Sequence, residues 1–154
     1  MKKILVISDS HGEKEYVDFL IGKGVYDFVI FAGDGVRDFD AEVFMLPNFK
    51  IVKGNCDYFS DYPELELFEI MNKLFFVTHG HIFNVKKTMI PISEQAIDVG
   101  ANVIVFGHTH EQFYDKVQDM YYINPGSLRY GDYAEIVMDN NKFVVDFKNI
   151  KEEI

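Results

Sequence analysis

Short apolar segments that lead directly into polar, glycine-containing clusters recur along this sequence, and they constrain the fold more than any other feature. The clearest example ends in Gly107-His108-Thr109-His110, which follows the apolar residues 103–106. An apolar run of this length, stopped by a glycine, predicts a buried strand. On extended backbone, side chains two residues apart point to the same side. We therefore expect His108 and His110 to face one point and to form half of a metal site.

The N-terminal half repeats this pattern three times. Strands are predicted over residues 2–8, 27–32 and 50–52, with helices over residues 13–23 and 38–46 between them. This alternation favours βαβ units and a mainly parallel sheet. The polar clusters that end the three strands are Asp9-Ser10-His11-Gly12, Gly33-Asp34-Gly35 and Gly54-Asn55-Cys56-Asp57. Ligands of open α/β sheets bind at the carboxyl ends of the strands, so we expect the three clusters to meet.

Paired strands dominate the predicted C-terminal half. Strands over residues 65–70 and 74–78 lead into His79-Gly80-His81, and a helix is predicted from near Lys87 to Val99. Two hairpins follow, with strands over residues 113–117 and 120–123 and over residues 133–138 and 142–147. The charged tail, residues 148–154, is expected to be solvated. No repeat or linker interrupts the 154 residues, which predicts one domain over residues 1–154.

Composition narrows the class of protein. The chain is 48% hydrophobic, which is typical of a globular protein, and no apolar run approaches the roughly 20 residues of a membrane span. The first apolar run is too short for a signal peptide, and one cysteine cannot form a disulfide framework, so we expect a cytoplasmic protein. A net charge of −10 argues against general nucleic-acid binding. If such a chain handles phosphates, bound divalent cations must supply positive charge.

All five histidines of the sequence lie directly after predicted strands. They are His11, His79, His81, His108 and His110. Asp9, Asp34 and Asn55 occupy equivalent positions, so the set offers nitrogen and oxygen ligands without a thiolate cluster. Such ligands suit two divalent first-row metals, of which Mn, Fe, Co, Ni and Zn are candidates. Two cations ~3.5–4 Å apart can clamp a phosphoryl group.

In this order along the chain, these motifs resemble those of the calcineurin-like metallophosphoesterase superfamily. The motifs are Asp9-x-His11, Gly33-Asp34, Gly54-Asn55, His79 and Gly107-His108-Thr109-His110. The short length, Gly54-Asn55-Cys56-Asp57 and Asn124-Pro125-Gly126-Ser127 are similar to the small YfcE-type phosphodiesterases. The resemblance implies an α/β fold with four layers, α/β/β/α, and a dimetal site at the strand ends.

The resemblance also implies a ligand set. One metal would be held by Asp9, His11, Asp34 and His110. The other would be held by Asp34, Asn55, His79 and His108. Asp34 would bridge the two cations, and manganese is the preferred metal.

Four residues are expected to take part in catalysis, namely Asn55, Cys56, His79 and His81. By resemblance, Asn55 also faces the substrate phosphate. Larger members of the superfamily have a histidine at the position of Cys56, and that histidine helps to bind phosphate and to protonate the leaving group. A thiol is a weak hydrogen-bond donor with an ordinary pKa of about 8.5, so Cys56 replaces it poorly. His81 is a second candidate for the acid, and a structural role for it stays open.

The function implied by the resemblance is hydrolysis of small phosphodiesters by a dimetal-activated hydroxide. Two alternatives stay open: a nucleotidase or phosphomonoesterase, and a non-catalytic scaffold similar to the retromer subunit Vps29. A complete ligand set favours the enzyme, and a homodimer is plausible. Arg37 and Arg129 are candidates for phosphate contacts, with surface exposure preferred. For Tyr58, Phe59 and Tyr62 we prefer core cover over a pocket wall or an oligomer interface.

Overall fold

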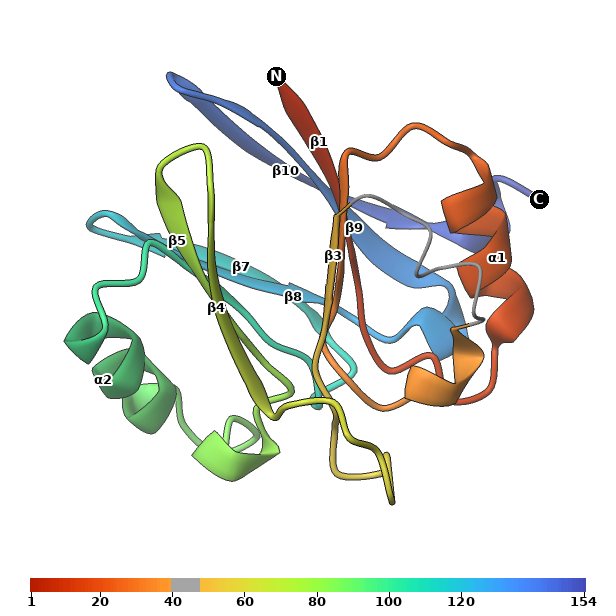
Figure 1. The fold of residues 1–154 in the computed structure, drawn as a ribbon, viewed down its shortest axis with the longest axis horizontal. Coiled ribbons are helices and arrows are strands. Elements are labelled where there is room, and N and C mark those ends of the chain that lie inside the picture. The colour runs from red at the N-terminus through yellow and green to blue at the C-terminus, as the bar shows by residue number, and fades with distance from the viewer. Residues whose placement is uncertain (40–47) are drawn as a thin grey trace.

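Two five-stranded sheets lie face to face in the computed structural model, which describes residues 1–39 and 48–154 (Figure 1). The first sheet has the order β10-β9-β1-β2-β3 and the second has the order β4-β5-β6-β8-β7. The strands of the first sheet are β1 (Lys2–Ile7), β2 (Phe28–Phe31), β3 (Phe49–Ile51), β9 (Asp132–Asp139) and β10 (Lys142–Asn149). Those of the second are β4 (Leu65–Ile70), β5 (Lys73–Thr78), β6 (Val103–Val105), β7 (Gln112–Val117) and β8 (Met120–Pro125).

The parallel arrangement predicted for the N-terminal strands is confirmed, and so are the three strand pairs predicted in the C-terminal half, β4–β5, β7–β8 and β9–β10. β1, β2 and β3 are parallel to one another, with Ile7 opposite Phe31, and so are β5, β6 and β8. β4, β7, β9 and β10 run antiparallel to their neighbours. Short turns after β4, β7 and β9 explain three of these antiparallel pairs, because strands joined by a tight turn pair antiparallel; β9 pairs antiparallel with β1 as well.

Alternating side chains of the strands fill three apolar layers. In β1, Ile4 and Val6 pack between the sheets, whereas Leu5 and Ile7 pack beneath α1 (Lys14–Gly22). In the second sheet, Ile104 of β6 packs with residues of α2 (Ile90–Asp98). Figure 1 shows α1 on the outer side of the first sheet and α2 on the outer side of the second. Because side chains alternate along each strand, each sheet packs against the other sheet on one face and against a helix on its other face. The resulting α/β/β/α layers confirm the predicted architecture.

Three local expectations need comment. Most of the helix expected over residues 38–46 lies outside the described residues. Asp38, which is described, ends a short 3-10 helix, η1 (Val36–Asp38). The second helix begins at Ile90 rather than near Lys87, with a proline in its first turn, where proline is favoured. In the described part of the chain, the helices are all too short or too polar to cross a membrane.

The prediction of a solvated tail over residues 148–154 is wrong for residues 148–150, whereas residues 151–154 are exposed. β10 continues to Asn149, and a 3-10 helix, η5 (Ile150–Glu152), follows it. Ile150 is fully buried beneath α1, and Glu153 forms an ion pair with Lys23, at 2.5 Å, and accepts a hydrogen bond from Tyr133. The buried side chain of Ile150 and the polar contacts of Glu153 together hold the tail against the first sheet.

Candidate metal centre

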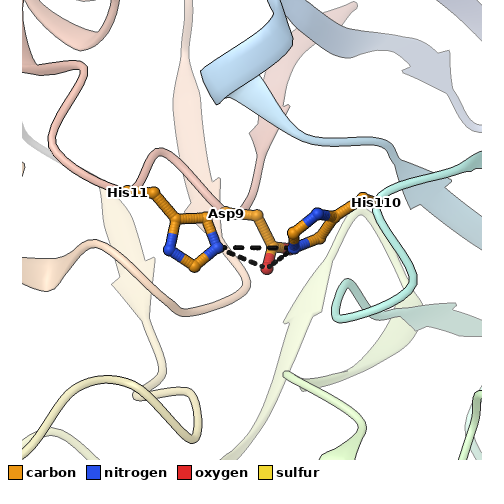
Figure 2. Close-up of side chains that lie close together, drawn as sticks. All are labelled: Asp9, His11 and His110. Carbon is orange, nitrogen blue, oxygen red and sulfur yellow. Dashed lines mark hydrogen bonds and ion pairs between the residues drawn. The ribbon is translucent and has the colours of Figure 1, made fainter.

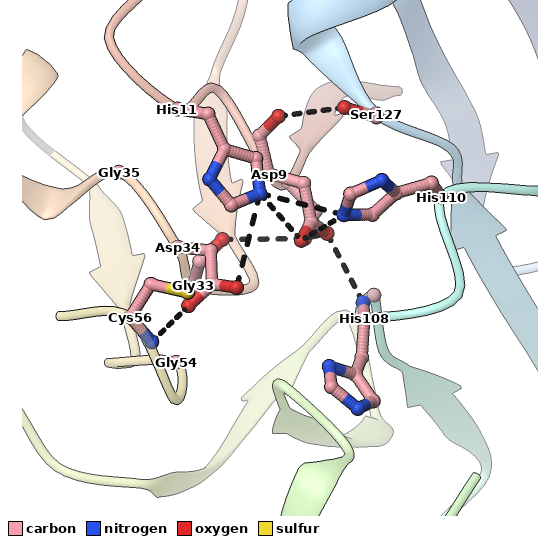
Figure 3. A network of polar contacts seen from close by, with 12 residues as sticks. Asp9, His11, Gly33, Asp34, Gly35, Gly54, Cys56, His108, His110 and Ser127 are labelled. Carbon is pink, nitrogen blue, oxygen red and sulfur yellow. Dashed lines mark hydrogen bonds and ion pairs between the residues drawn. The ribbon is translucent and has the colours of Figure 1, made fainter. Parts of the chain in front are cut away.

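The carboxyl ends of four strands bring the predicted ligands together. β1 leads to Asp9 and His11, β2 to Asp34, β5 to His79, and β6 to the loop of His108 and His110. The two sheets are tied to each other here, because the backbone N–H of His108 donates to Asp9 Oδ2 at 3.0 Å. Figure 3 shows the side chains of Asp9, His11 and Asp34 from the first sheet meeting those of His108 and His110 from the second. The site therefore lies where the ends of the two sheets meet.

Asp9, His11 and His110 form the first donor cluster (Figure 2). Asp9 Oδ1 lies 3.4 Å from His11 Nε2 and 3.2 Å from His110 Nε2, and the two nitrogens are 3.4 Å apart. Metal–ligand bonds of ~2.0–2.2 Å separate neighbouring ligand atoms by roughly 3–3.5 Å. The three atoms are thus spaced as three ligands of one first-row cation.

Asp34, His79 and His108 form the second donor cluster. His79 Nε2 lies 3.1 Å from Asp34 Oδ2 and 3.2 Å from His108 Nδ1. The other nitrogen of His79, Nδ1, lies 2.7 Å from the carbonyl oxygen of Ala32, which can only accept a hydrogen bond. Nδ1 therefore carries a proton, and Nε2 is the atom that a cation would use.

Between the two clusters lies a carboxylate oxygen, Asp9 Oδ1, that accepts no hydrogen bond from the described residues. This oxygen is buried, and His11, His79 and His110 all face it. Asp34 Oδ2 lies 3.8 Å from His11 Nε2 as well as close to His79, so it also faces both clusters. Buried carboxylate oxygens normally have partners, and a cation would supply one here. The donor set thus fits divalent metal ions.

Charges within the centre shift its pKa values. Burial acts to raise the pKa of Asp34, but the hydrogen bond and charge of His79 outweigh it and hold this pKa at about 2. For His79, burial acts to lower the pKa, but Asp34 and Asp9 raise it. Burial and the nearby His79 lower the pKa of His108 to about 4. His108 is therefore neutral near pH 7, and its ring nitrogen is available as a ligand.

The loop backbone departs from the extended geometry assumed for His108-Thr109-His110. Both histidines are left-handed, with φ of 72° and 64°, and they face different clusters rather than one point. Asp9, His11 and Asp34 are left-handed too, with φ of 54°, 44° and 64°. Non-glycine residues rarely adopt this conformation, and it concentrates at functional sites. The expectation from spacing, that both imidazoles face one point, is therefore wrong, whereas the ligand set implied by the resemblance puts them on different metals.

Three further predicted catalytic residues lie near the clusters: Cys56 beside His11 and Asp34, His81 beside His79 and His108, and Asn55 beside Cys56. Asn55 is exposed, and its Nδ2 contacts Cys56 Sγ at 3.5 Å. The backbone N–H of Cys56 donates to Asp34 Oδ1 at 2.8 Å, and burial and the charge of Asp34 raise the pKa of its thiol. The His81 ring centre lies 5.6 Å from that of His79, and burial and His79 lower the pKa of His81. Its Nδ1 is buried and has no hydrogen-bond partner among the described residues.

Several supporting residues were missed in the sequence. The carboxylate of Asp57 accepts hydrogen bonds from four backbone N–H groups, those of Asp34, Gly35, Val36 and Gly54, at 2.7–3.1 Å. Ser8 Oγ donates to Asp9 Oδ2 at 2.6 Å, and Ser127 Oγ donates to the Asp9 carbonyl at 2.8 Å (Figure 3). The sequence offered one signal for these residues. Tight polar loops leave backbone N–H groups unpaired, so polar side chains in neighbouring loops are needed as acceptors.

Gly54 offers a test of how closely the loops around Asp34 are packed. A Cβ at this position would lie 2.2 Å from Asp34 Oδ1 and 2.7 Å from the Asp34 backbone nitrogen. Gly54→Ala should therefore displace the carboxylate and weaken metal binding by roughly 10–100-fold, a range typical of lost ligand support. Metal content after dialysis measures this effect.

Gly22→Ala is the matched control for Gly54→Ala, because a Cβ on Gly22 at the end of α1 meets no atom within 4 Å. It should bind metal like the unmodified chain. Equal metal content in both variants would show that the loop yields without disturbing Asp34.

Comparison with known proteins gives the family. The family model of the calcineurin-like phosphoesterase superfamily domain matches residues 1–139. A relative from Bacillus subtilis, named "Probable metallophosphoesterase YsnB", is 32% identical over 152 residues, which cover 94% of this chain and 89% of the relative. A phosphodiesterase of Methanocaldococcus jannaschii is 31% identical over 145 residues, covering 80% of this chain and 82% of the relative.

Solved structures show the same fold. A predicted phosphoesterase from Streptococcus pneumoniae superposes with a TM-score of 0.86 at 28% identity, covering 97% of this chain and 90% of that one. Vps29 from Entamoeba histolytica, solved in complex with zinc, has a TM-score of 0.82 at 20% identity, covering 96% and 92%, and shares the fold. From the family model, the relatives and the donor clusters together, we conclude that this chain belongs to the calcineurin-like phosphoesterase superfamily.

Proposed function

We propose that the protein is a metal-dependent phosphodiesterase that hydrolyses small phosphodiesters. One observation carries the proposal: two donor clusters face each other across the oxygens of Asp9 and Asp34, and Asp9 Oδ1 is buried without a hydrogen-bond partner among the described residues. The relatives named metallophosphoesterase and phosphodiesterase support the reaction class.

The proposed ligand set takes the two clusters, shares Asp34 between them and adds Asn55 to the second. Asp9, His11, Asp34 and His110 would hold one cation, and Asp34, Asn55, His79 and His108 would hold the other. The nitrogen and oxygen donors suit manganese, with Ni, Fe, Co or Zn as substitutes. When bound, two such cations lower the pKa of a water and stabilise negative charge on the phosphoryl oxygens.

The chain's own residues prepare the reaction in three ways. Ala32 fixes the tautomer of His79, and Ser8, Ser127 and the His108 N–H fix the position of Asp9. While the amide oxygen of Asn55 would hold the cation, its exposed NH₂ group would donate to a phosphate oxygen of the substrate. Proton delivery to the leaving alcohol falls to His81 or Cys56. The raised pKa of Cys56 keeps its thiol protonated near neutral pH, so it still carries a proton to donate.

Removal and replacement of metal tests the proposal. The protein is treated with a chelator, and hydrolysis of bis(p-nitrophenyl) phosphate and of p-nitrophenyl phosphate is measured with no metal and with Mn, Ni, Zn or Mg. We expect chelation to remove diester hydrolysis and Mn to restore it by at least about a hundredfold, because the cations supply both the nucleophile and charge stabilisation.

The ratio of the two substrates decides between diester and monoester specificity. A higher kcat/KM for the monoester would favour the nucleotidase or phosphomonoesterase alternative. If mass spectrometry finds two metals per chain and neither ester is hydrolysed with any of them, the enzymatic proposal is wrong and a scaffold of the Vps29 kind becomes the better hypothesis.

A further inference from the structure

The only two arginines of the sequence, Arg37 and Arg129, line the same pocket. This pocket has a volume of about 470 Å³, and its wall includes His11 and Asp34 of the metal centre. Arg37 belongs to η1, which follows β2, and Arg129 belongs to η4 (Leu128–Tyr130), which follows β8. Figure 1 shows these two short helices near each other beside α1. None of the lysines lines the pocket, so an acidic chain concentrates both guanidinium groups at its metal centre.

The carboxylates of this pocket are occupied by other donors. Asp57 accepts four backbone N–H groups, and Asp38 Oδ2 accepts from Ser10 Oγ at 2.6 Å and from the Gly12 N–H at 2.9 Å. Within residues 1–39 and 48–154, neither arginine forms an ion pair, both are exposed, and Arg129 lies over the ring of its neighbour Tyr130, 6.0 Å from the ring centre. Guanidinium groups bind phosphate through paired, charge-assisted hydrogen bonds. The two groups are therefore available for an anion.

Aromatic side chains continue the pocket on the side of Arg37. Tyr58 lines both this pocket and an adjoining one of about 540 Å³, which Arg37 and Phe59 also line. The exposed fractions are 75% for Tyr58 and 104% for Phe59, so core cover, the preferred expectation for these two, is wrong. Tyr62, by contrast, packs partly against the core beneath α1. Exposed rings beside cationic groups favour stacking of a flat group such as a nucleobase.

We propose that Arg37 and Arg129 form an anion subsite that selects phosphodiesters carrying a second phosphate, with a flat group of the same substrate against Tyr58. The inference rests on the proposed function and narrows its substrate class to nucleotide-like diesters. The second phosphate is bound and not cleaved, so it adds binding energy without entering the reaction.

A matched substrate pair tests the subsite. The p-nitrophenyl ester of thymidine 5′-phosphate is compared with the same ester carrying a 3′-phosphate, using the manganese-loaded protein. We expect kcat/KM to be about tenfold or more higher for the ester with the 3′-phosphate, since a charge-assisted pair is worth that much. Arg37→Gln and Arg129→Gln should each reduce this ratio toward one.

Binding provides a readout that does not depend on turnover. Calorimetry should find that thymidine 3′,5′-bisphosphate binds the unmodified protein about tenfold tighter than thymidine 5′-phosphate, and that both arginine variants lose the difference. Lys86→Gln is the control, because it removes one positive charge from a different pocket that contains neither arginine. This variant should still bind the bisphosphate about tenfold tighter than the monophosphate. Thermal melts of the variants establish that they fold.

The outcomes separate this inference from the proposed function. Equal affinity for the two nucleotides, or an equal effect of Lys86→Gln, would overturn the subsite even if simple diesters are hydrolysed. A preserved binding difference with no hydrolysis of any ester would support the subsite and contradict the phosphodiesterase.

Discussion

Asp34→Ala should abolish diester hydrolysis, with kcat/KM falling by at least about a thousandfold, because the removed carboxylate faces both donor clusters. The same change removes the partner of His79, whose pKa Asp34 raises, and the acceptor of the Cys56 N–H. Both cations would therefore lose a ligand, and the loop that carries Asn55 would lose an anchor. Metal content by mass spectrometry and hydrolysis of bis(p-nitrophenyl) phosphate measure the two effects together.

Asp18→Ala is the control for this substitution. Asp18 is an exposed aspartate on α1 whose carboxylate pairs with Lys14 at 2.5 Å, one helical turn away, and such a pair contributes little. Its variant should bind metal and turn over like the unmodified chain. Turnover by Asp34→Ala within about tenfold of the unmodified protein, with two metals still bound, would contradict the bridging assignment.

The order of the polar clusters made much of the centre predictable. Each cluster follows a strand of the parallel part of a sheet, and parallel strands place their carboxyl ends at one edge. This rule predicted that Asp9, His11 and Asp34 would meet, and His79 was expected with them because it too follows a predicted strand. The rule needs only the periodicity of apolar residues and the positions of glycines, both of which are local properties of the sequence.

What the sequence did not reveal depends on conformations that local patterns do not specify. The left-handed backbone at His108 and His110 sends the two imidazoles to different clusters, which the family resemblance implied but their spacing alone did not. The exposure of Tyr58 and Phe59 was missed for a related reason. Aromatic residues are usually buried, and the turn that carries them, with Phe59 itself left-handed at φ of 64°, holds them outside the core.

Asp57 belongs to the same class of missed residue, and its carboxylate explains how the loops keep their shape. Oδ1 accepts the N–H groups of Gly35 and Val36 at 2.9 and 3.1 Å. Oδ2 accepts those of Asp34 and Gly54 at 2.7 and 2.8 Å. One side chain thus joins the loop after β2 to the loop after β3. Four donors on one acceptor group also leave Asp57 unavailable to the arginines of the pocket.

Asp57→Asn should lower the free energy of unfolding by about 2–4 kcal/mol, since the amide keeps one acceptor oxygen and leaves two of the four N–H groups facing its NH₂. The loosened loops should also weaken metal binding by roughly 10–100-fold, because residues that orient ligands contribute on this scale. Urea denaturation of the metal-free protein measures the first effect, and metal titration measures the second.

The matched control is Asp119→Asn, which changes an exposed aspartate in the turn between β7 and β8. It should leave both quantities unchanged. If Asp57→Asn loses stability but keeps metal affinity, the carboxylate supports the fold without positioning Asp34. If it keeps both, water replaces the lost acceptor, and the shape of the loops must come from their glycines and left-handed residues instead.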